Sequence, residues 1–328
     1  MKRSRILIHN FYVYCGGALV LSELCSTLRK LGYDARLIVT STNPQSEAGC
    51  SYLKRVWVKD SLLTLFYIIL CKCLPFKKLK EKYNYSSFFP LHLVGQKRLW
   101  LPFFNKKRDI VIHPETVYGN PFEAKNVARW QLYHYQYFND KNAYSDSDLF
   151  LGYRDVFNDM ERTPDVENVF INSFNHSLYS RTNFGERRGK CFIVRKGANR
   201  RDLPVKFDGI VVDDLPETEI VKVFNECEYC YSYDTQTFYS LIAAICGCKS
   251  IVVPEPGKSM SDYLDPLEPT YGVAWSDSED EITRAVNTVD ELIASLNKFK
   301  ERNLLEAEKL VSILEKQFNI KITRCRNI

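Results

Sequence analysis

A basic pair, Arg195 and Lys196, stands at the end of residues 191–194, which have the pattern of a short buried strand. Cationic side chains at the end of a strand suit phosphate oxygens, because charge-assisted hydrogen bonds are stronger than neutral ones. The alternative is an ordinary basic loop whose two side chains are solvated. We therefore treat Arg195 and Lys196 as candidates for binding a phosphate-containing ligand.

A second polar cluster lies within residues 229–254, which have the pattern strand, turn, helix, turn, strand. Tyrosines at every second position predict the first strand, and Gly247 predicts the end of an apolar helix that begins near Phe238. The free N–H groups at the start of a buried helix attract anions, so the residues between strand and helix are predicted to hold a diphosphate. They are Thr235, Gln236 and Thr237, which follow Tyr233 and Asp234, and helix capping is the alternative role for the two threonines.

Glu115 is a carboxylate in a position that suits acid–base chemistry. Residues 108–112 predict a strand and Pro114 prevents further pairing, so Glu115 should lie at the carboxyl end of that strand. Ligands of open α/β sheets bind at such ends. We therefore predict that Glu115 lies in a ligand-binding site, where a carboxylate suits acid–base chemistry, the alternative being a turn residue that caps nearby N–H groups.

Gly16 and Gly17 stand between a predicted strand at residues 6–8 and a predicted helix that ends near Lys30. Two glycines at such a turn let the backbone approach a ligand closely, although turns also use glycine for geometry alone. The spacing is not G-x-G-x-x-G, so the dinucleotide-binding fingerprint is missing. This argues against a nicotinamide-dependent oxidoreductase, which stays as a rival class of enzyme.

Strands and helices are predicted to alternate along the whole chain. Further strands are expected at residues 35–39, 148–151, 210–212 and 271–275, and helices at 217–225, 279–288 and, by their leucine pattern, 290–318. Residues 126–131 are predicted to begin another helix. The alternation predicts the α/β class with parallel sheets.

Two Rossmann-like domains are expected from this order of elements. We predict an N-terminal domain at residues 1–172, a linker at 173–188, and a second domain at 189–300. A C-terminal helix at 301–328 is expected to pack back on the first domain.

Composition narrows the class of protein. The chain has 328 residues, 45% hydrophobic and 26% charged, as expected for a globular protein with a substantial core. Its formal net charge of +5 does not indicate nucleic acid, but it suits an anionic ligand or an anionic membrane surface. Met1-Lys2-Arg3 precedes a strand pattern and not a long apolar run, so no signal peptide is evident and we expect a cytoplasmic protein.

The 11 cysteines are an odd number scattered through predicted strands and helices, which favours reduced thiols over a disulfide framework. Cys227, Cys230, Cys246 and Cys248 loosely imitate the spacing of a zinc site. The second pair is C-x-C, however, and one member closes an apolar helix. We therefore expect core thiols and no metal cofactor.

Residues 62–82 join an apolar run to a lysine-rich end. The run is too short to span a bilayer and already contains Lys72. Two interpretations stay open: a core helix with a solvated basic end, or a helix that lies on an anionic membrane surface. The second would make the protein peripheral at the inner face of a membrane.

Three places in the sequence resemble the GT-B glycosyltransferases. The most specific is residues 113–121 with Arg129-Trp130, which is similar to a "PE-x-x-x-GNP … RW" signature of bacterial polysaccharide glycosyltransferases. The other two are the glycine turn and first helix at residues 16–35, and residues 233–248 with Arg195-Lys196 upstream. Residues 45–105 match little.

The resemblance implies two facing Rossmann-like domains and transfer of a sugar from a nucleoside-diphosphate sugar to a glycan or lipid-linked acceptor. It implies a bacterial enzyme of surface polysaccharide biosynthesis, of the capsule or O-antigen type. Because the basic pair and the helix start could stabilise the diphosphate without a metal, we expect no metal cofactor. The donor would contact the basic pair, residues 233–237 and the Gly16–Gly17 turn. The acceptor would contact His113, Tyr118 and Asn120, with Glu115 as the catalytic residue.

One departure from the family is evident. Many retaining members carry an E-x7-E motif whose second glutamate binds the donor ribose, whereas this chain has Asp234 at the first position and Ile242 at the second. An isoleucine cannot accept a hydrogen bond from a ribose hydroxyl. The alternative function is therefore a catalytically inactive protein of the same fold that binds a nucleotide sugar or a glycan.

Overall fold

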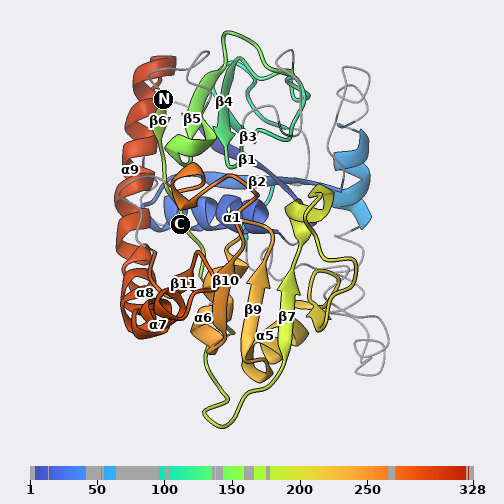
Figure 1. Ribbon diagram of the computed structural model, residues 1–328. Coiled ribbons are helices and arrows are strands. Elements are labelled where there is room, and N and C mark those ends of the chain that lie inside the picture. The colour runs from blue at the N-terminus through green and yellow to red at the C-terminus, as the bar shows by residue number, and fades with distance from the viewer. Residues whose placement is uncertain are drawn as a thin grey trace, which may run out of the picture. The chain divides into compact units, whose positions relative to one another are not determined.

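The computed structural model describes residues 4–13, 15–41, 53, 55–63, 96–99, 103–134, 137, 143–158, 166–174, 178–264, 270–322 and 324. The chain forms two compact units. Unit 1 comprises Met1–Ser173 and Lys300–Ile328, and unit 2 comprises Phe174–Phe299. Each unit contains one parallel sheet with helices packed on it (Figure 1). The last three elements of secondary structure in the described chain are helices. The predicted α/β class with two Rossmann-like units and a helical C-terminus is confirmed.

The sheet of unit 1 has six parallel strands in the order β2-β1-β3-β4-β5-β6. Their bounds are β1 Ile6–Phe11, β2 Ala35–Thr40, β3 Ile110–Pro114, β4 Asn126–Gln131, β5 Leu149–Gly152 and β6 Glu167–Asn168. The four strands β1 to β4 are buried at nearly every position, as strands covered on both faces must be.

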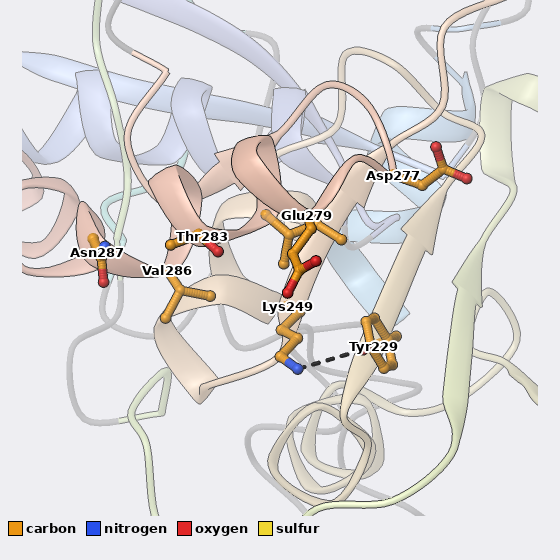
Figure 2. Close-up of a pocket in the computed structure, with 8 residues that line it drawn as sticks. Tyr229, Lys249, Asp277, Glu279, Thr283, Val286 and Asn287 are labelled. Atoms are coloured by element: carbon orange, nitrogen blue, oxygen red, sulfur yellow. Dashed lines mark hydrogen bonds between the residues drawn. The ribbon is translucent and has the colours of Figure 1, made fainter.

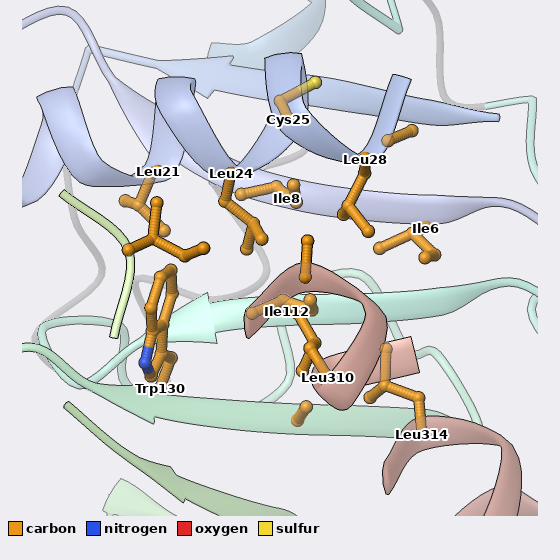
Figure 3. Packing of buried hydrophobic residues seen from close by; sticks show 14 of the residues in the cluster. Ile6, Ile8, Leu21, Leu24, Cys25, Leu28, Ile112, Trp130, Leu310 and Leu314 are labelled. Carbon is orange, nitrogen blue, oxygen red and sulfur yellow. The ribbon is translucent and has the colours of Figure 1, made fainter. Parts of the chain in front are cut away.

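Two helices cover one face of this sheet. α1 (Gly16–Lys30) places Leu21, Leu24 and Leu28 on Ile6, Ile8 and Trp130, and α9 (Phe299–Phe318) adds Leu310 and Leu314 to the same cluster (Figure 3). On the opposite face Leu7, Val111 and Val127 pack with Trp57 and Phe122. The last described helix therefore completes the core of the first unit.

The sheet of unit 2 has five parallel strands in the order β11-β10-β9-β7-β8. Their bounds are β7 Lys190–Ile193, β8 Ile210–Val211, β9 Tyr229–Ser232, β10 Lys249–Val252 and β11 Val273–Ala274. α5 (Glu217–Glu226) and α6 (Tyr239–Cys246) pack on one face, around Cys191 and Cys230. α7 (Glu279–Asn287) packs on the other face through Ile282 and Ala285, and α8 (Val289–Asn297) packs against α6.

The stretch from β9 to β10 matches its prediction closely. α6 ends at Gly247, whose φ of 100° is the left-handed conformation that favours glycine. The buried helix between two parallel strands is thus held by an apolar surface on nearly every side.

Two predicted helices differ from the structure. Residues 126–131, predicted to begin a helix, form strand β4, so that prediction was wrong. Asn126, Arg129 and Gln131 gave the segment no strand-like alternation, because all six side chains are buried and three of them are polar. The leucine pattern of 290–318 is divided at Lys298 into α8 and α9.

Only the start of the 62–82 segment falls within the described residues. Leu62 and Leu63 are exposed at the end of the helical residues 55–63, and residues 64–82 lie outside the described part. Among the described helices, none combines the length and the apolar character needed to cross a bilayer.

The contribution of α9 to the core of unit 1 can be tested with two leucines of the same helix. Leu310→Ala should lower the free energy of unfolding by about 2–5 kcal/mol, because it leaves a cavity in a packed core. Leu305→Ala should change it by no more than about 0.5 kcal/mol, because that side chain is exposed. Urea unfolding followed by circular dichroism measures both, and equal losses would contradict the packing described.

Candidate active site

Each sheet has one place where the strand order reverses. In unit 1 the chain proceeds from β1 to β2 on one side and from β3 to β4 on the other, so the reversal lies between β1 and β3. In unit 2 it lies between β7 and β9. Loops that leave the carboxyl ends of such neighbouring strands diverge, and the space between them is where open α/β sheets bind ligands.

The loop after β7 begins with Arg195 in an unusual conformation. Its φ is 38°, a left-handed value that is costly for a side chain other than glycine. The backbone N–H groups of Val194 and Arg195 donate to the two carboxylate oxygens of Asp213, at 3.1 and 2.6 Å. Asp213 thus fixes this turn and the direction in which Arg195 leaves the strand.

The side chain of Arg195 lies at the start of α6. Its guanidinium carbon is 4.0 Å from the centre of the Tyr239 ring, and Tyr239 is the first residue of that helix. The Tyr239 hydroxyl donates to Glu217 at 2.5 Å, which holds the ring in place. The Nε atom of Arg195 is buried and has no hydrogen-bond partner among the described residues.

The loop after β9 contains the remaining predicted donor residues. Asp234 is 3% exposed; its Oδ1 accepts from the Gln236 N–H at 3.2 Å, and its Oδ2 has no hydrogen-bond partner in the described part of the chain. The Thr237 hydroxyl accepts from the Tyr239 N–H at 3.3 Å, although the N-cap residue of α6 is Phe238. Thr235 is partly exposed.

Two residues that sequence reasoning missed tie these loops together. A Cβ atom on Gly197 would lie 2.4 Å from the Tyr233 carbonyl oxygen, so only glycine permits this approach. Arg200 donates to the carbonyl oxygens of Tyr233 and Val253 at 3.0 and 2.7 Å. The carboxyl ends of β9 and β10 are thereby joined to the loop that carries Arg195 and the exposed Lys196. Arg200 stands only a few residues after Arg195 and Lys196, and this closeness in the sequence was the signal that could have identified it.

At the carboxyl edge of unit 1, Gly16 and Gly17 begin α1 directly after the β1 loop. Asn10, near the end of β1, donates to the Ala18 carbonyl at 3.0 Å and to Ser22 at 2.9 Å, which holds the helix to the strand. A Cβ on Gly16 would meet nothing within 4 Å. The described fold therefore gives no steric reason for a glycine there.

Glu115 follows the last residue of β3 and is 5% exposed. Its N–H donates to the Trp130 carbonyl at 3.2 Å, and its Oε2 accepts from the Leu132 N–H at 3.0 Å. The Tyr144 hydroxyl donates to its carbonyl oxygen at 2.5 Å. The carboxylate is therefore held at the ends of β3 and β4, at the edge where the sequence placed it.

His113 lies one step deeper and is fully buried, and its Nε2 has no hydrogen-bond partner among the described residues. Its Nδ1 lies 3.0 Å from Nδ1 of His9, whose Nε2 lies 2.9 Å from the Thr40 hydroxyl. Burial, with Arg129 nearby, lowers the pKa of His9 to about 3 and the pKa of His113 well below its usual value. Both imidazoles are thus neutral parts of the interior.

Tyr118 and Asn120 lie in the turn after Glu115 and are partly buried. The Asn120 amide exchanges hydrogen bonds with the backbone of Ala124, at 2.7 and 3.2 Å, which closes that turn. Arg129 supports it from below by donating to the carbonyl oxygens of Val117 and Gly119, while Asp148 pairs with its Nε at 2.8 Å. The buried "RW" arginine is therefore a structural support of the Glu115 turn.

A cavity of about 440 Å³ lies elsewhere on unit 2. It is lined by Tyr229 and Lys249, which begin β9 and β10, and by residues of α7, and Lys249 donates to the Tyr229 hydroxyl at 3.3 Å (Figure 2). It contains none of the predicted site residues and lies away from the carboxyl ends of these two strands. We place the candidate chemistry at the carboxyl ends of the strands, where Glu115 is buried in unit 1 and Asp234 in unit 2.

The clustered thiols of unit 2 are part of its core. Cys191, Cys227, Cys230 and Cys248 are buried and free. Burial raises the pKa of nearby Cys246 to about 12, as it does for thiols in apolar surroundings. Within the described ranges, no group of three or more His, Cys, Asp or Glu residues is arranged to hold a metal ion.

The chain is similar to known proteins in structure but not in sequence. No protein-family model matches the sequence, and no curated protein matches it. A glycosyltransferase from Rickettsia africae ESF-5 is similar over 98% of this chain and 100% of its own, with a TM-score of 0.42 and 8% identity. SnogD, a glycosyltransferase from Streptomyces nogalater, is similar over 95% of this chain and 100% of its own, with a TM-score of 0.37 and 10% identity.

An alpha-glucosyltransferase in complex with UDP and a 13-mer DNA is similar over 97% of this chain and 99% of its own. Its TM-score is 0.41 and its identity 11%. Likeness at these values decides nothing about the activity of this chain, which must be argued from its own residues.

The buried histidine pair predicts how stability depends on pH. The folded pKa values lie below the usual 6.5, so the unfolded chain binds more protons and stability should fall as the pH drops below that value. The expected loss is about 1.4 kcal/mol per pH unit for each histidine until its folded pKa is reached.

Urea unfolding between pH 7 and pH 4.5 measures this loss. The double variant His9→Gln, His113→Gln keeps hydrogen-bonding groups that do not titrate, so its stability should depend less on pH. The same slope in both proteins would contradict the assignment.

Proposed function

We propose that the protein is a GT-B glycosyltransferase that moves a sugar from a nucleoside-diphosphate sugar to a glycan or lipid-linked acceptor. Unit 2 would bind the donor at the carboxyl ends of β7 and β9. Unit 1 would bind the acceptor at the carboxyl ends of β1 and β3.

The position of Arg195 carries the proposal. A helix N-terminus has a partial positive charge, so a guanidinium stacked on the first residue of α6 puts two positive groups together. Such an arrangement favours an anion beside it, and the left-handed backbone of Arg195 adds a strain typical of functional sites. A diphosphate there would accept hydrogen bonds from the guanidinium and would lie at the positive end of the helix dipole.

These groups would also act in the reaction. When the glycosidic bond of the donor breaks, negative charge develops on the departing diphosphate, and Arg195, Lys196 and the start of α6 would stabilise it without a metal ion. Each contact made away from water supplies roughly 3–4 kcal/mol, by analogy with oxyanion-hole donors. Thr235, Gln236 and Thr237 add hydroxyl and amide groups at the same place.

Asp234 would recognise the donor sugar. Its buried Oδ2, which no described residue contacts by a hydrogen bond, accepts from a hydroxyl group better than a solvated carboxylate does. Ile242 is buried in the apolar cluster under α6, so the ribose must be recognised by other residues.

Glu115 would take the proton from the acceptor hydroxyl if the reaction inverts the anomeric configuration, and would orient the acceptor if it retains it. The Leu132 N–H fixes the carboxylate, so little reorganisation is needed at the moment of transfer. Tyr118 and Asn120 would form the wall beside it, and Gly16–Gly17 would let the substrate approach the backbone.

The resemblance of residues 113–130 to bacterial polysaccharide glycosyltransferases gives the biological setting that we propose. The acceptor would be a growing capsule or O-antigen glycan, and the enzyme would work in the cytoplasm. Residues 62–82 would bring it to the inner face of the membrane when the acceptor is lipid-linked.

Donor binding is tested by thermal shift with UDP, GDP, dTDP, CDP and ADP. One of these should raise the melting temperature of the wild type, and Arg195→Ala should weaken its affinity about 10- to 100-fold, because a charged hydrogen bond is lost. Arg188→Ala is the matched control, because that arginine is exposed and pairs only with Glu186 in the described structure. Equal affinity in all three proteins would remove Arg195 from the donor site.

Turnover is tested with the nucleotide sugar that corresponds to the best nucleotide. Glu115→Gln should reduce transfer about 100- to 10,000-fold while nucleotide affinity and melting temperature stay close to those of the wild type. Hydrolysis and transfer both absent from a wild type that binds the nucleotide would instead favour the inactive binding protein.

A further inference from the structure

Gln131, the last residue of β4, is the neighbour of Glu115 at the sheet edge. Pro114 pairs with Trp130, so the next pair in register is Glu115 and Gln131. The backbone on each side of Gln131 is bonded to Glu115, since the Trp130 carbonyl accepts from its N–H and the Leu132 N–H donates to its carboxylate. Gln131 therefore lies between the two residues that bond Glu115.

The side chain of Gln131 is buried and unpaired. It is 1% exposed, and neither Nε2 nor Oε1 has a hydrogen-bond partner among the described residues. An amide contains strong donors and a strong acceptor, and burying them without partners costs free energy. Packing alone would be served better by leucine or methionine.

Asn126, at the other end of the same strand, shows what a structural amide looks like in this fold. It is 4% exposed, and its Nδ2 donates to the carbonyl oxygens of Lys107 and Asp109 at 3.1 and 3.3 Å. The difference follows the sheet: the amide at the amino edge is paired, and the amide at the carboxyl edge, beside Glu115, is not.

We propose that Gln131 binds the acceptor sugar and selects for neighbouring hydroxyl groups, which rests on the function proposed above. The amide oxygen accepts from one hydroxyl and the amide nitrogen donates to the next, so the pair of atoms matches a neutral diol. An anionic acceptor would leave the amide oxygen facing negative charge, and an apolar one would leave both atoms unpaired. Held in this way, one hydroxyl of the diol faces Glu115.

The rival explanation is a structural glutamine, and stability separates the two. Gln131→Leu removes two unpaired buried groups at similar volume, so the melting temperature should stay the same or rise. Asn126→Leu removes paired groups and strands two carbonyl oxygens, so it should lower the melting temperature by roughly 2–6 °C. A fall in Gln131→Leu as large as that in Asn126→Leu would overturn the proposal.

Acceptor kinetics give the second test, with p-nitrophenyl glycosides of neutral sugars as probes. Gln131→Leu should raise the acceptor KM about 10- to 100-fold for the best glycoside, because two hydrogen bonds are lost and two hydroxyls are left unpaired. The donor KM and the rate of donor hydrolysis should stay as in the wild type. Asn126→Leu should leave the acceptor KM unchanged.

The sugar probes also test the choice of hydroxyls. A deoxy glycoside that lacks one hydroxyl of the pair should lose affinity in the wild type and lose little more in Gln131→Leu, since the variant no longer contacts that group. Additive losses would show that Gln131 and that hydroxyl do not interact.

The outcomes distinguish this inference from the function beneath it. A wild type that neither binds a nucleoside diphosphate nor transfers sugar refutes the glycosyltransferase itself. A wild type that transfers sugar, with an unchanged acceptor KM in Gln131→Leu, refutes only the role of Gln131. A wild type that hydrolyses the donor and accepts none of the neutral glycosides refutes the neutral-diol acceptor.

Discussion

The reversal of strand order within each parallel sheet is the constraint on which the rest depends. Parallel strands need crossover connections, and where the direction of crossing changes, two neighbouring strands send their loops apart. In unit 1 this separates the loop of β1 from that of β3, and in unit 2 the loop of β7 from that of β9. All the proposed site residues follow one of these four strands, apart from the glutamine that ends β4.

The second theme is that charge at these edges is supported by half-buried or buried polar groups. Asp213 holds the backbone of Arg195, and Glu217 holds the Tyr239 ring on which the Arg195 guanidinium lies. Arg200 joins the ends of β9 and β10. In unit 1, Arg129 performs a similar task below the Glu115 turn. Preorganisation of this kind lets a site meet a charged or hydroxylated ligand without first paying for its own rearrangement.

Sequence reasoning found the elements whose patterns are simple. The β1–α1 glycine turn, the apolar α6 with Gly247, and the strands of unit 2 were all predictable, because local periodicity and turn chemistry agree there. β4 was missed because its buried polar residues are stabilised by distant partners, such as Asp148 for Arg129. The same cause hid Arg200 and Glu217, and left His113 as a surface candidate although its ring is interior. Long-range pairing of polar groups is not encoded in local spacing.

The place of α9 in the architecture has a consequence for synthesis on the ribosome. Leu310 and Leu314 complete a core whose other members, such as Leu21 and Trp130, are translated far earlier. The nascent first unit must therefore wait, with an apolar surface uncovered, while the whole of unit 2 is made and has time to fold. During that interval the unfinished chain is a natural client for chaperones that bind exposed hydrocarbon.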